Sequence, residues 1–177
     1  MKILKNELKG KLKIRTQQDY PVKGVEFVDI TPLIMDKKLF HKITKKFCDE
    51  VKGQEVDYIV APEARGFLFG TCVAYELGIP FVPVRKPGKL PREIISEKYD
   101  LEYGTNEISI HKDAINPGEK ILVVDDLLAT GGTVNAVTKL VERSGAEVVG
   151  LAFAIELEAL KGRELLKKYD VMSLLQY

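Results

Sequence analysis

The sequence predicts an α/β protein whose central, mostly parallel, twisted sheet is flanked by helices. Short apolar runs rich in β-branched residues alternate with segments of helical periodicity along most of the 177 residues. Gly78 and Gly145 directly follow two of the helical segments, at the position where a left-handed residue commonly ends a helix. Alternating strands and helices favour a parallel sheet with right-handed crossovers, covered on both faces.

The elements follow one another in a regular order. Leu4, Leu8 and Leu12 recur at helical spacing among lysines and predict a first helix. A second helix follows Asp36, which suits the N-cap position, and ends at Gly53. Its apolar stripe consists of Phe40, Ile43, Phe47 and Val51. The later elements are a strand at 56–61, a helix at 67–77, a strand at 81–85, a long charged loop at 86–98, a β-ribbon formed by 99–103 and 107–110, a type II turn at 116–119, a strand at 120–126, a helix at 132–144, a strand at 147–155, a short helix and a final strand at 171–177.

The composition narrows the class of protein. Lys and Arg number 27 and Asp and Glu 26, so the formal net charge is +1 and no basic excess favours nucleic acid or a membrane surface. No apolar run approaches the roughly 18 residues of a spanning helix, and the charged N-terminus does not resemble a signal peptide. Cys48 and Cys72 fall in helical patterns among apolar neighbours, which predicts buried structural thiols. We therefore expect a cytoplasmic protein with a single domain over residues 1–177.

The segment Ala129-Thr130-Gly131-Gly132-Thr133 lies between a predicted buried strand and a predicted helix. Unpaired N–H groups at a helix N-terminus point outward and favour an anion. The two glycines let the main chain curl around a phosphate, and the two threonine hydroxyls can donate to its oxygens. The spacing of an ATP-binding P-loop is absent. The segment is either a phosphate site or a glycine-rich turn with a threonine cap.

Two carboxylates, Asp125 and Asp126, precede this segment and would repel a phosphate placed directly beside them. Vicinal sugar hydroxyls can donate to carboxylates, and Mg²⁺ carried by a diphosphate would also favour negative charge nearby. A sugar 5-phosphate with free 2- and 3-hydroxyls satisfies both halves of the motif. Asp125 and Asp126 are therefore predicted to bind the ribose, and residues 129–133 its 5-phosphate.

The stretch VVDDLLATGGT resembles the phosphoribosyl-diphosphate fingerprint of the type I phosphoribosyltransferases. Further stretches are similar to the members of that family that act on adenine: GVEFVDITPL (24–33), EARGFLFG (63–70), VPVRKPGKLP (82–91), YDLEYG (99–104) and SLLQY (173–177). They span most of the chain in the family's order. The resemblance implies the family's fold, with a small hood over residues 1–35 and a mobile loop over about 86–103 that closes over the site.

The resemblance also implies roles for single residues. Glu102 would act as acid or base at the purine, with Asp125 and Asp126 completing the catalytic set. Phe27 and Leu127 would pack on the two faces of the base, while main-chain groups around Val25, Glu26 and Val28 would read its edge. Val28 stands where relatives commonly have arginine. Valine suits this position if it acts through its main chain, whereas a role for the side chain would imply weaker binding of the base. The diphosphate would be bound by Glu63, Ala64, Arg65, Arg85, Lys86, Lys89 and Tyr103.

The expected reaction transfers the 5-phosphoribosyl group of 5-phosphoribosyl 1-diphosphate (PRPP) to adenine, giving AMP and diphosphate. Mg²⁺ would arrive with the substrate and through water, without a ligand directly from the protein, and a homodimer is expected from the resemblance alone. Two alternatives remain open. One is a nucleotide-sensing regulator that has lost catalysis, against which the missing basic surface argues. The other is an enzyme for hypoxanthine, guanine or xanthine, because the phosphate and ribose residues do not distinguish the bases.

Overall fold

The computed structural model describes residues 15–177 except 21, 22, 25, 102 and 103. The strands are β1 (Arg15–Gln18), β2 (Glu26–Asp29), β3 (Tyr58–Pro62), β4 (Phe81–Val84), β5 (Ile94–Leu101), β6 (Gly104–His111), β7 (Lys120–Leu128), β8 (Glu147–Glu156) and β9 (Val171–Gln176). The helices are α2 (Thr31–Met35), α3 (Lys37–Glu50), α4 (Gly66–Leu77) and α5 (Gly132–Arg143), with the 3₁₀ helices η1 (Glu158–Leu160) and η2 (Gly162–Leu166).

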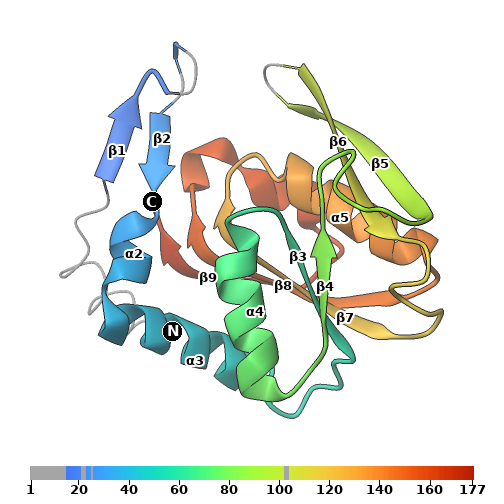
Figure 1. Ribbon diagram of the computed structural model, residues 1–177. Helices are drawn as coiled ribbons and strands as arrows, with labels where there is room; N and C mark the ends of the chain where they lie inside the picture. Colours follow the sequence, from blue (N-terminus) through green and yellow to red (C-terminus); the bar gives the residue numbers. More distant parts are fainter. Residues whose placement is uncertain (1–14, 21–22, 25, 102–103) are drawn as a thin grey trace.

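Five parallel strands form the central sheet in the order β4-β3-β7-β8-β9 (Figure 1). β7 lies in the middle, paired with β3 on one side and β8 on the other. Side chains alternate between the two faces of a strand. Leu122 and Val124 pack into the hydrophobic cluster on one face, and Ile121 and Val123 into the cluster on the other. The continuous apolar run of β7 is therefore explained by burial on both faces.

Helices cover both faces of this sheet, which confirms the predicted fold class. α4 packs on β3 and β7, and α3 packs on the outer side of α4. α5 covers the opposite face, where Val137 and Leu140 are fully buried. Right-handed crossovers between parallel strands place the helices in this way, so that the carboxyl ends of all five strands meet at one edge.

Two antiparallel hairpins stand above that edge, β1–β2 on one side and β5–β6 on the other (Figure 1). The second hairpin is attached to α5 by charge. Glu97 accepts an ion pair from Lys139 at 3.3 Å and another from Arg143 at 3.1 Å, and Arg143 also donates to the Ser96 carbonyl at 2.7 Å. The hairpin is also joined to the sheet, because Arg85 after β4 exchanges two main-chain hydrogen bonds with Ser109 in β6.

The second predicted helix begins as expected. The Asp36 carboxylate accepts from the N–H groups of Lys38 and Leu39 at 2.9 and 3.1 Å, which is N-capping. The helix ends at Glu50, three residues before Gly53. α2 has no counterpart among the elements that the sequence predicts. Cys48 and Cys72 are free and half-buried, so burial of these thiols is only partial.

The prediction of a loop over 86–98 is wrong from Ile94 onward, because residues 94–101 form β5. The apolar alternation of that strand is interrupted in the sequence by Glu97, which lies on the packed face and pairs with Lys139 and Arg143 of α5. Ile95 packs against the core and the Ser96 hydroxyl lies 2.8 Å from that of Ser109. The predicted first helix with Leu4, Leu8 and Leu12 lies outside the described residues. Among the helices that the structure does describe, none is both long and apolar enough to cross a bilayer.

Candidate active site

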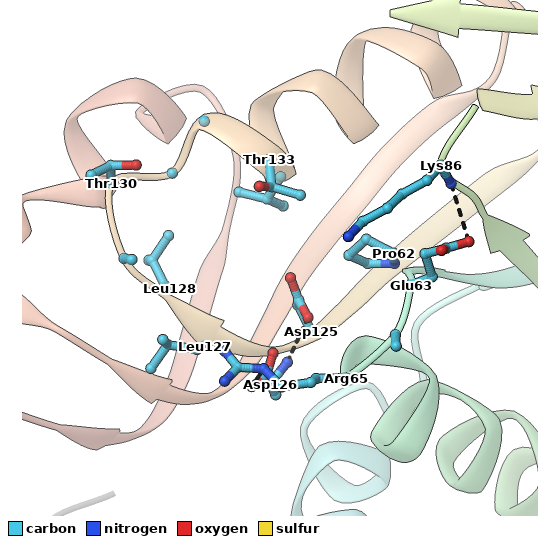
Figure 2. A pocket seen from close by; sticks show the side chains of 15 residues that line it. Pro62, Glu63, Arg65, Lys86, Asp125, Asp126, Leu127, Leu128, Thr130 and Thr133 are labelled. Atoms are coloured by element: carbon cyan, nitrogen blue, oxygen red, sulfur yellow. Dashed lines mark hydrogen bonds and ion pairs between the residues drawn. The ribbon is translucent and has the colours of Figure 1, made fainter. Parts of the chain in front are cut away.

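A cavity of about 470 Å³ lies at the carboxyl ends of β3 and β7 (Figure 2). The two strands are neighbours in register, with Val60 beside Val123, so the loops that follow them lie side by side. Ligands bind at this edge in open α/β sheets, and the volume suits a small organic molecule. The cavity is lined by Pro62, Glu63, Ala64, Arg65, Lys86, Asp125, Asp126, Leu127, Leu128, Ala129, Thr130, Gly131, Gly132, Thr133 and Val134.

The glycine-rich segment forms one wall of the cavity. Gly131 adopts a left-handed conformation with φ 85°, which turns the chain from β7 into α5. α5 begins at Gly132, and the N–H of Asn135 is the first donor to close a turn, onto the Gly131 carbonyl at 2.9 Å. The N–H groups of residues 132–134 precede it and have no helical acceptor. Residues 129–133 therefore present a row of main-chain donors at the positive end of the α5 dipole.

The two aspartates leave β7 on opposite sides of the strand, as Figure 2 shows, because successive side chains alternate. Asp126 is 3% exposed, and its main-chain N–H donates to Asp125 Oδ1 at 2.8 Å. Arg65 Nε lies 2.8 Å from Asp126 Oδ2 as an ion pair, but that oxygen accepts no aligned hydrogen bond. The acid pair is thus held close together with one buried oxygen lacking a donor.

The electrostatics of the pair follow from burial. Burial raises the pKa of Asp125 well above its ordinary value, and the adjacent charge of Asp126 raises it further. Burial also raises the pKa of Asp126, although the Arg65 guanidinium works in the opposite direction. Asp126 is buried and Asp125 half-buried beside it, and two neighbouring carboxylates in such surroundings favour a ligand that donates hydrogen bonds or carries positive charge. A sugar diol meets the first requirement, and a hydrated cation meets the second.

The loop after β3 is held by Glu63. Its carboxylate accepts from Arg85 Nε in a close ion pair and from the main-chain N–H of Lys86 at 3.1 Å. Burial opposes the charge on Glu63, but Arg85 and the Lys86 N–H outweigh it and lower the pKa of that carboxyl. The peptide bond between Glu63 and Ala64 is cis. Figure 2 shows the Lys86 side chain reaching into the cavity towards Asp125.

Arg65 joins the cavity to the first hairpin. Its Nη1 donates to the Val28 carbonyl at 3.4 Å, and its Cζ lies 5.3 Å from the centroid of the Phe27 ring. The Val28 side chain is buried in the core, so only the main chain of that residue faces the site. Arg65 was predicted at the diphosphate, and the structure gives it partners in the acid pair and in the hairpin as well.

The predicted site residues are not all brought together. Phe27 is half-buried and Glu26 exposed in β2, while Leu127 lines the cavity from β7. Arg85 is engaged by Glu63 and does not line the cavity, nor does the exposed Lys89. The predicted residues Val25, Glu102 and Tyr103 lie outside the described part of the chain.

Two contacts to the glycine-rich segment were missed in the sequence. The Thr133 hydroxyl donates to the Tyr99 hydroxyl at 3.4 Å, which connects the second hairpin to the site. The main chain of Gly162 packs on the main chain of residues 129–131 from behind. Gly162 comes 30 positions after Gly132 in the sequence, and only its being glycine in a charged segment could have drawn attention to it.

Within the described residues, no cluster of three or more His, Cys, Asp and Glu side chains could hold a metal ion. Asp125 and Asp126 both line the cavity, and Mg²⁺ is commonly held by one or two carboxylates together with substrate phosphates. The site therefore fits Mg²⁺ that is carried by a phosphorylated ligand better than a resident ion.

The chain is similar to known proteins in sequence and in structure. Residues 34–176 match the phosphoribosyl transferase domain family. An adenine phosphoribosyltransferase of Clostridium kluyveri is 56% identical over 164 residues, which are 93% of this chain and 95% of that protein.

Crystal structures of adenine phosphoribosyltransferases agree. The enzyme of Thermoanaerobacter pseudethanolicus superposes with a TM-score of 0.91 at 50% identity, over 97% of this chain and 99% of its own. The enzyme of Saccharomyces cerevisiae, solved with adenine and D-2,5-dideoxy-2,5-imino-altritol 1,6-bisphosphate, superposes with a TM-score of 0.89 at 39% identity, over 98% and 99%. The chain belongs to the phosphoribosyl transferase family, and within that family to the group of the adenine phosphoribosyltransferases.

Proposed function

We propose that this chain transfers the 5-phosphoribosyl group of PRPP to adenine, giving AMP and diphosphate, in purine salvage. The observation that carries the proposal is one cavity in which the amino end of a helix lies beside an acid pair. Such a cavity suits a sugar phosphate, because the anionic phosphate requires hydrogen-bond donors whereas the sugar hydroxyls can donate to carboxylates. The relatives named adenine phosphoribosyltransferase, and the yeast enzyme crystallised with adenine, support adenine as the acceptor.

The 5-phosphate is assigned to residues 129–133. Its charge would be met by the unpaired N–H groups of the first turn of α5 and by the hydroxyls of Thr130 and Thr133. These donors are part of a rigid strand-to-helix junction, so little reorganisation is needed when the phosphate binds. Fixed donors of this kind are effective at positioning a reacting group.

The ribose hydroxyls are assigned to Asp125 and Asp126. Asp126 Oδ2 accepts no aligned hydrogen bond, although Arg65 Nε lies 2.8 Å from it, and a hydroxyl proton beside the two carboxylates would relieve the repulsion between them. The 1-diphosphate is then assigned to Arg65, Lys86 and the main chain of residues 63–65. Arg85, Lys89 and Tyr103 are included by resemblance. When bound, Mg²⁺ supplies charge neutralisation for the leaving diphosphate.

The base is assigned to the side of the cavity near β2. Phe27 and Leu127 would pack on its two faces, and the main chain of residues 25–28 would read its edge. In the reaction the bond between the anomeric carbon and the diphosphate oxygen breaks, and a ring nitrogen of adenine bonds to that carbon. Glu102 would hold or take the proton of the purine.

The boundaries proposed for these parts are one domain over 1–177, a hood mainly over 1–35 and a mobile loop over about 86–103. Residues 86–93 have no regular structure, and Lys86 lines the cavity. Both observations support the proposed loop over its first part, residues 86–93. Closure of such a loop would exclude water from the reactive sugar.

A homodimer is proposed as the working state. Its support is an apolar groove of about 420 Å³ between α2, α3 and α4, lined in part by Ile34, Phe40 and Cys72. Met35 and Tyr75 at the groove are 77% and 86% exposed. Large apolar side chains gathered in this way commonly mark a protein interface.

A purine panel tests the proposed reaction directly. Purified protein with PRPP and Mg²⁺ is expected to release diphosphate with adenine, and to release less with hypoxanthine, guanine or xanthine. Chelation of Mg²⁺ should stop the release, and added Mg²⁺ should restore it. Binding of adenine and PRPP without any turnover would instead favour a regulator, and a preference for another purine would replace adenine in the proposal.

Replacement of the assigned catalytic residues should reduce turnover while the protein stays folded. For Glu102→Ala we expect kcat to fall by about 10² or more, the usual range for a general acid or base. For Asp126→Asn we expect a fall of about the same size, because the sugar would be positioned less well. Glu93→Ala, which removes an exposed carboxylate of the same segment, is the matched control and should remain near wild type. Near-normal kcat for both folded site variants would refute these roles.

Asp125→Asn should make the protein more stable at pH 7. The raised pKa of Asp125 means that the folded protein disfavours the ionised carboxylate, which is the form that the unfolded chain adopts at this pH. Such a group contributes stability at low pH that is lost as the pH rises from the unfolded value, about 3.9, through the folded value. The asparagine keeps the acceptor for the Asp126 N–H without the buried charge. We expect a higher melting temperature than wild type at pH 7 and a smaller difference below about pH 4.

Thermal unfolding at several pH values provides the measurement, with Asp49→Asn as control. Asp49 is an exposed acid on α3, and its replacement should change little. A lower melting temperature for Asp125→Asn at pH 7, with Asp49→Asn unchanged, would contradict this account of the acid pair.

The dimer is tested by mass in solution. Wild type should elute with twice the 19.9 kDa mass of the chain in size-exclusion chromatography with light scattering. Tyr75→Asp should shift it towards the monomer, because a charge would be buried in the interface. Leu160→Asp, at an exposed apolar residue outside the groove, is the control. A wild-type monomer at micromolar concentration would exclude the dimer.

A further inference from the structure

The segment after β8 forms a second layer behind residues 129–131. A Cβ built on Gly131 would lie 2.6 Å from the Gly162 carbonyl oxygen. A Cβ built on Gly162 would overlap the Ala129 carbonyl oxygen and would lie 3.1 Å from the Gly131 nitrogen and 2.9 Å from Leu128 Cδ1. Main chain therefore packs on main chain at this point, with no space for a methyl group on either side.

This second layer is attached to the sheet by Arg163, the residue after Gly162. Its Nε donates to Glu156 Oε1 at 2.6 Å and its Nη2 to Glu156 Oε2 at 2.8 Å, a bidentate ion pair. Glu156 is the last residue of β8, and its neighbours in the sheet are Leu128 on β7 and Gln176 on β9. Glu156, one partner of the ion pair, thus lies beside Leu128, which directly precedes the glycine-rich segment.

The surroundings leave this pair few other arrangements. Glu156 is 4% exposed and also accepts from the Ser173 hydroxyl at 2.5 Å and from Gln176 Nε2 at 3.3 Å. Arg163 Nη1 donates to the Val171 carbonyl at 2.8 Å. Burial acts against the charge on Glu156, but Arg163 and the other donors outweigh it and lower the pKa of that carboxyl. The pair is therefore charged at neutral pH, with both carboxylate oxygens satisfied.

The end of the same short helix is also fixed. Leu166, the last residue of η2, is fully buried in the hydrophobic cluster under α5. Gly162 is thus held between the ion pair of Arg163 on one side and the turn at Lys161, with φ 52°, on the other. A segment constrained in this way can support the main chain of residues 129–131 from behind. The opposite side of residues 129–131 faces the cavity.

We propose that the Glu156–Arg163 ion pair holds Gly162 against the back of residues 129–131 and so fixes the main-chain donors that receive the 5-phosphate. Glu156, Gly162 and Arg163 are positioning residues, since none of them lines the cavity. The inference rests on the proposed function only in taking residues 129–133 as the phosphate site. A misplacement of about 1 Å in such a site can cost roughly 10²-fold in rate.

Gly162→Ala is the direct test, because it adds only the methyl group for which there is no space. Its matched control is Gly150→Ala in β8, where a Cβ would meet the flexible Leu122 side chain at 3.3 Å. The measurements are the Kd of ribose 5-phosphate by calorimetry, the KM values for PRPP and adenine, and the melting temperature. For Gly162→Ala we expect the Kd of ribose 5-phosphate and the KM for PRPP to rise by about tenfold or more, while the KM for adenine stays within about twofold.

Arg163 variants probe the ion pair without adding volume. Arg163→Met should show the same selective loss of ribose 5-phosphate and PRPP binding, and Arg163→Lys should recover part of it, since a lysine keeps the charge but not the bidentate geometry. If Gly162→Ala does not fold, the comparison of Arg163→Lys with Arg163→Met tests the proposal instead. The quantity compared is the ratio of the KM for PRPP to the KM for adenine. A purely structural role would lower the melting temperature and leave that ratio unchanged.

The inference fails if folded Gly162→Ala binds ribose 5-phosphate within about twofold of wild type, or if the Arg163 variants raise both KM values equally. Thr133→Val separates this outcome from failure of the proposed function. If Thr133→Val weakens ribose 5-phosphate binding and Gly162→Ala does not, only the positioning role is wrong. If wild type does not bind ribose 5-phosphate at all, the phosphate site itself is wrong.

Discussion

The site depends on the burial of β7 on both faces as far as Val124. A strand enclosed by α4 on one side and α5 on the other has no freedom of register, so the residues that follow it are delivered to one place. Asp125 and Asp126 are the first polar side chains after this buried run. Asp126 is buried and Asp125 half-buried, which is costly for charged groups; the ion pair with Arg65 offsets part of this cost for Asp126.

Parallel pairing of β3 with β7 then supplies the remainder of the cavity. Residues that are more than 60 positions apart in the sequence, Arg65 and Asp126, meet as an ion pair. The same arginine contacts Phe27 and the Val28 carbonyl. One guanidinium therefore joins the side of the cavity proposed for the sugar to the side proposed for the base. Glu63 has a comparable effect on the next strand, because it fixes Arg85 and the main chain of Lys86.

The sequence was most informative where local chemistry decides the structure. The apolar run before Asp125, the glycines at 131 and 132 and the cap at Asp36 each have a local physical cause, and these elements were predicted correctly. Contacts between distant segments were not visible in the same way. Nothing near Arg65 indicates that Asp126 is its partner, and nothing near Gly162 indicates that it packs behind Gly131. Residues 94–98 were not predicted as strand because Glu97 stands between Ile95 and Tyr99 on the face that packs on α5 and interrupts the apolar alternation. Their pairing with β6 makes them a strand.

The burial of the Val28 side chain has a consequence for redesign of the protein. Since that side chain belongs to the hydrophobic core, exchanging it would disturb packing before it altered any contact with a bound heterocycle. A library aimed at accepting unnatural nucleobases would therefore gain little from randomising this position. Alterations in the length or curvature of the β1–β2 ribbon, which shift carbonyl and amide groups together, are the more promising route.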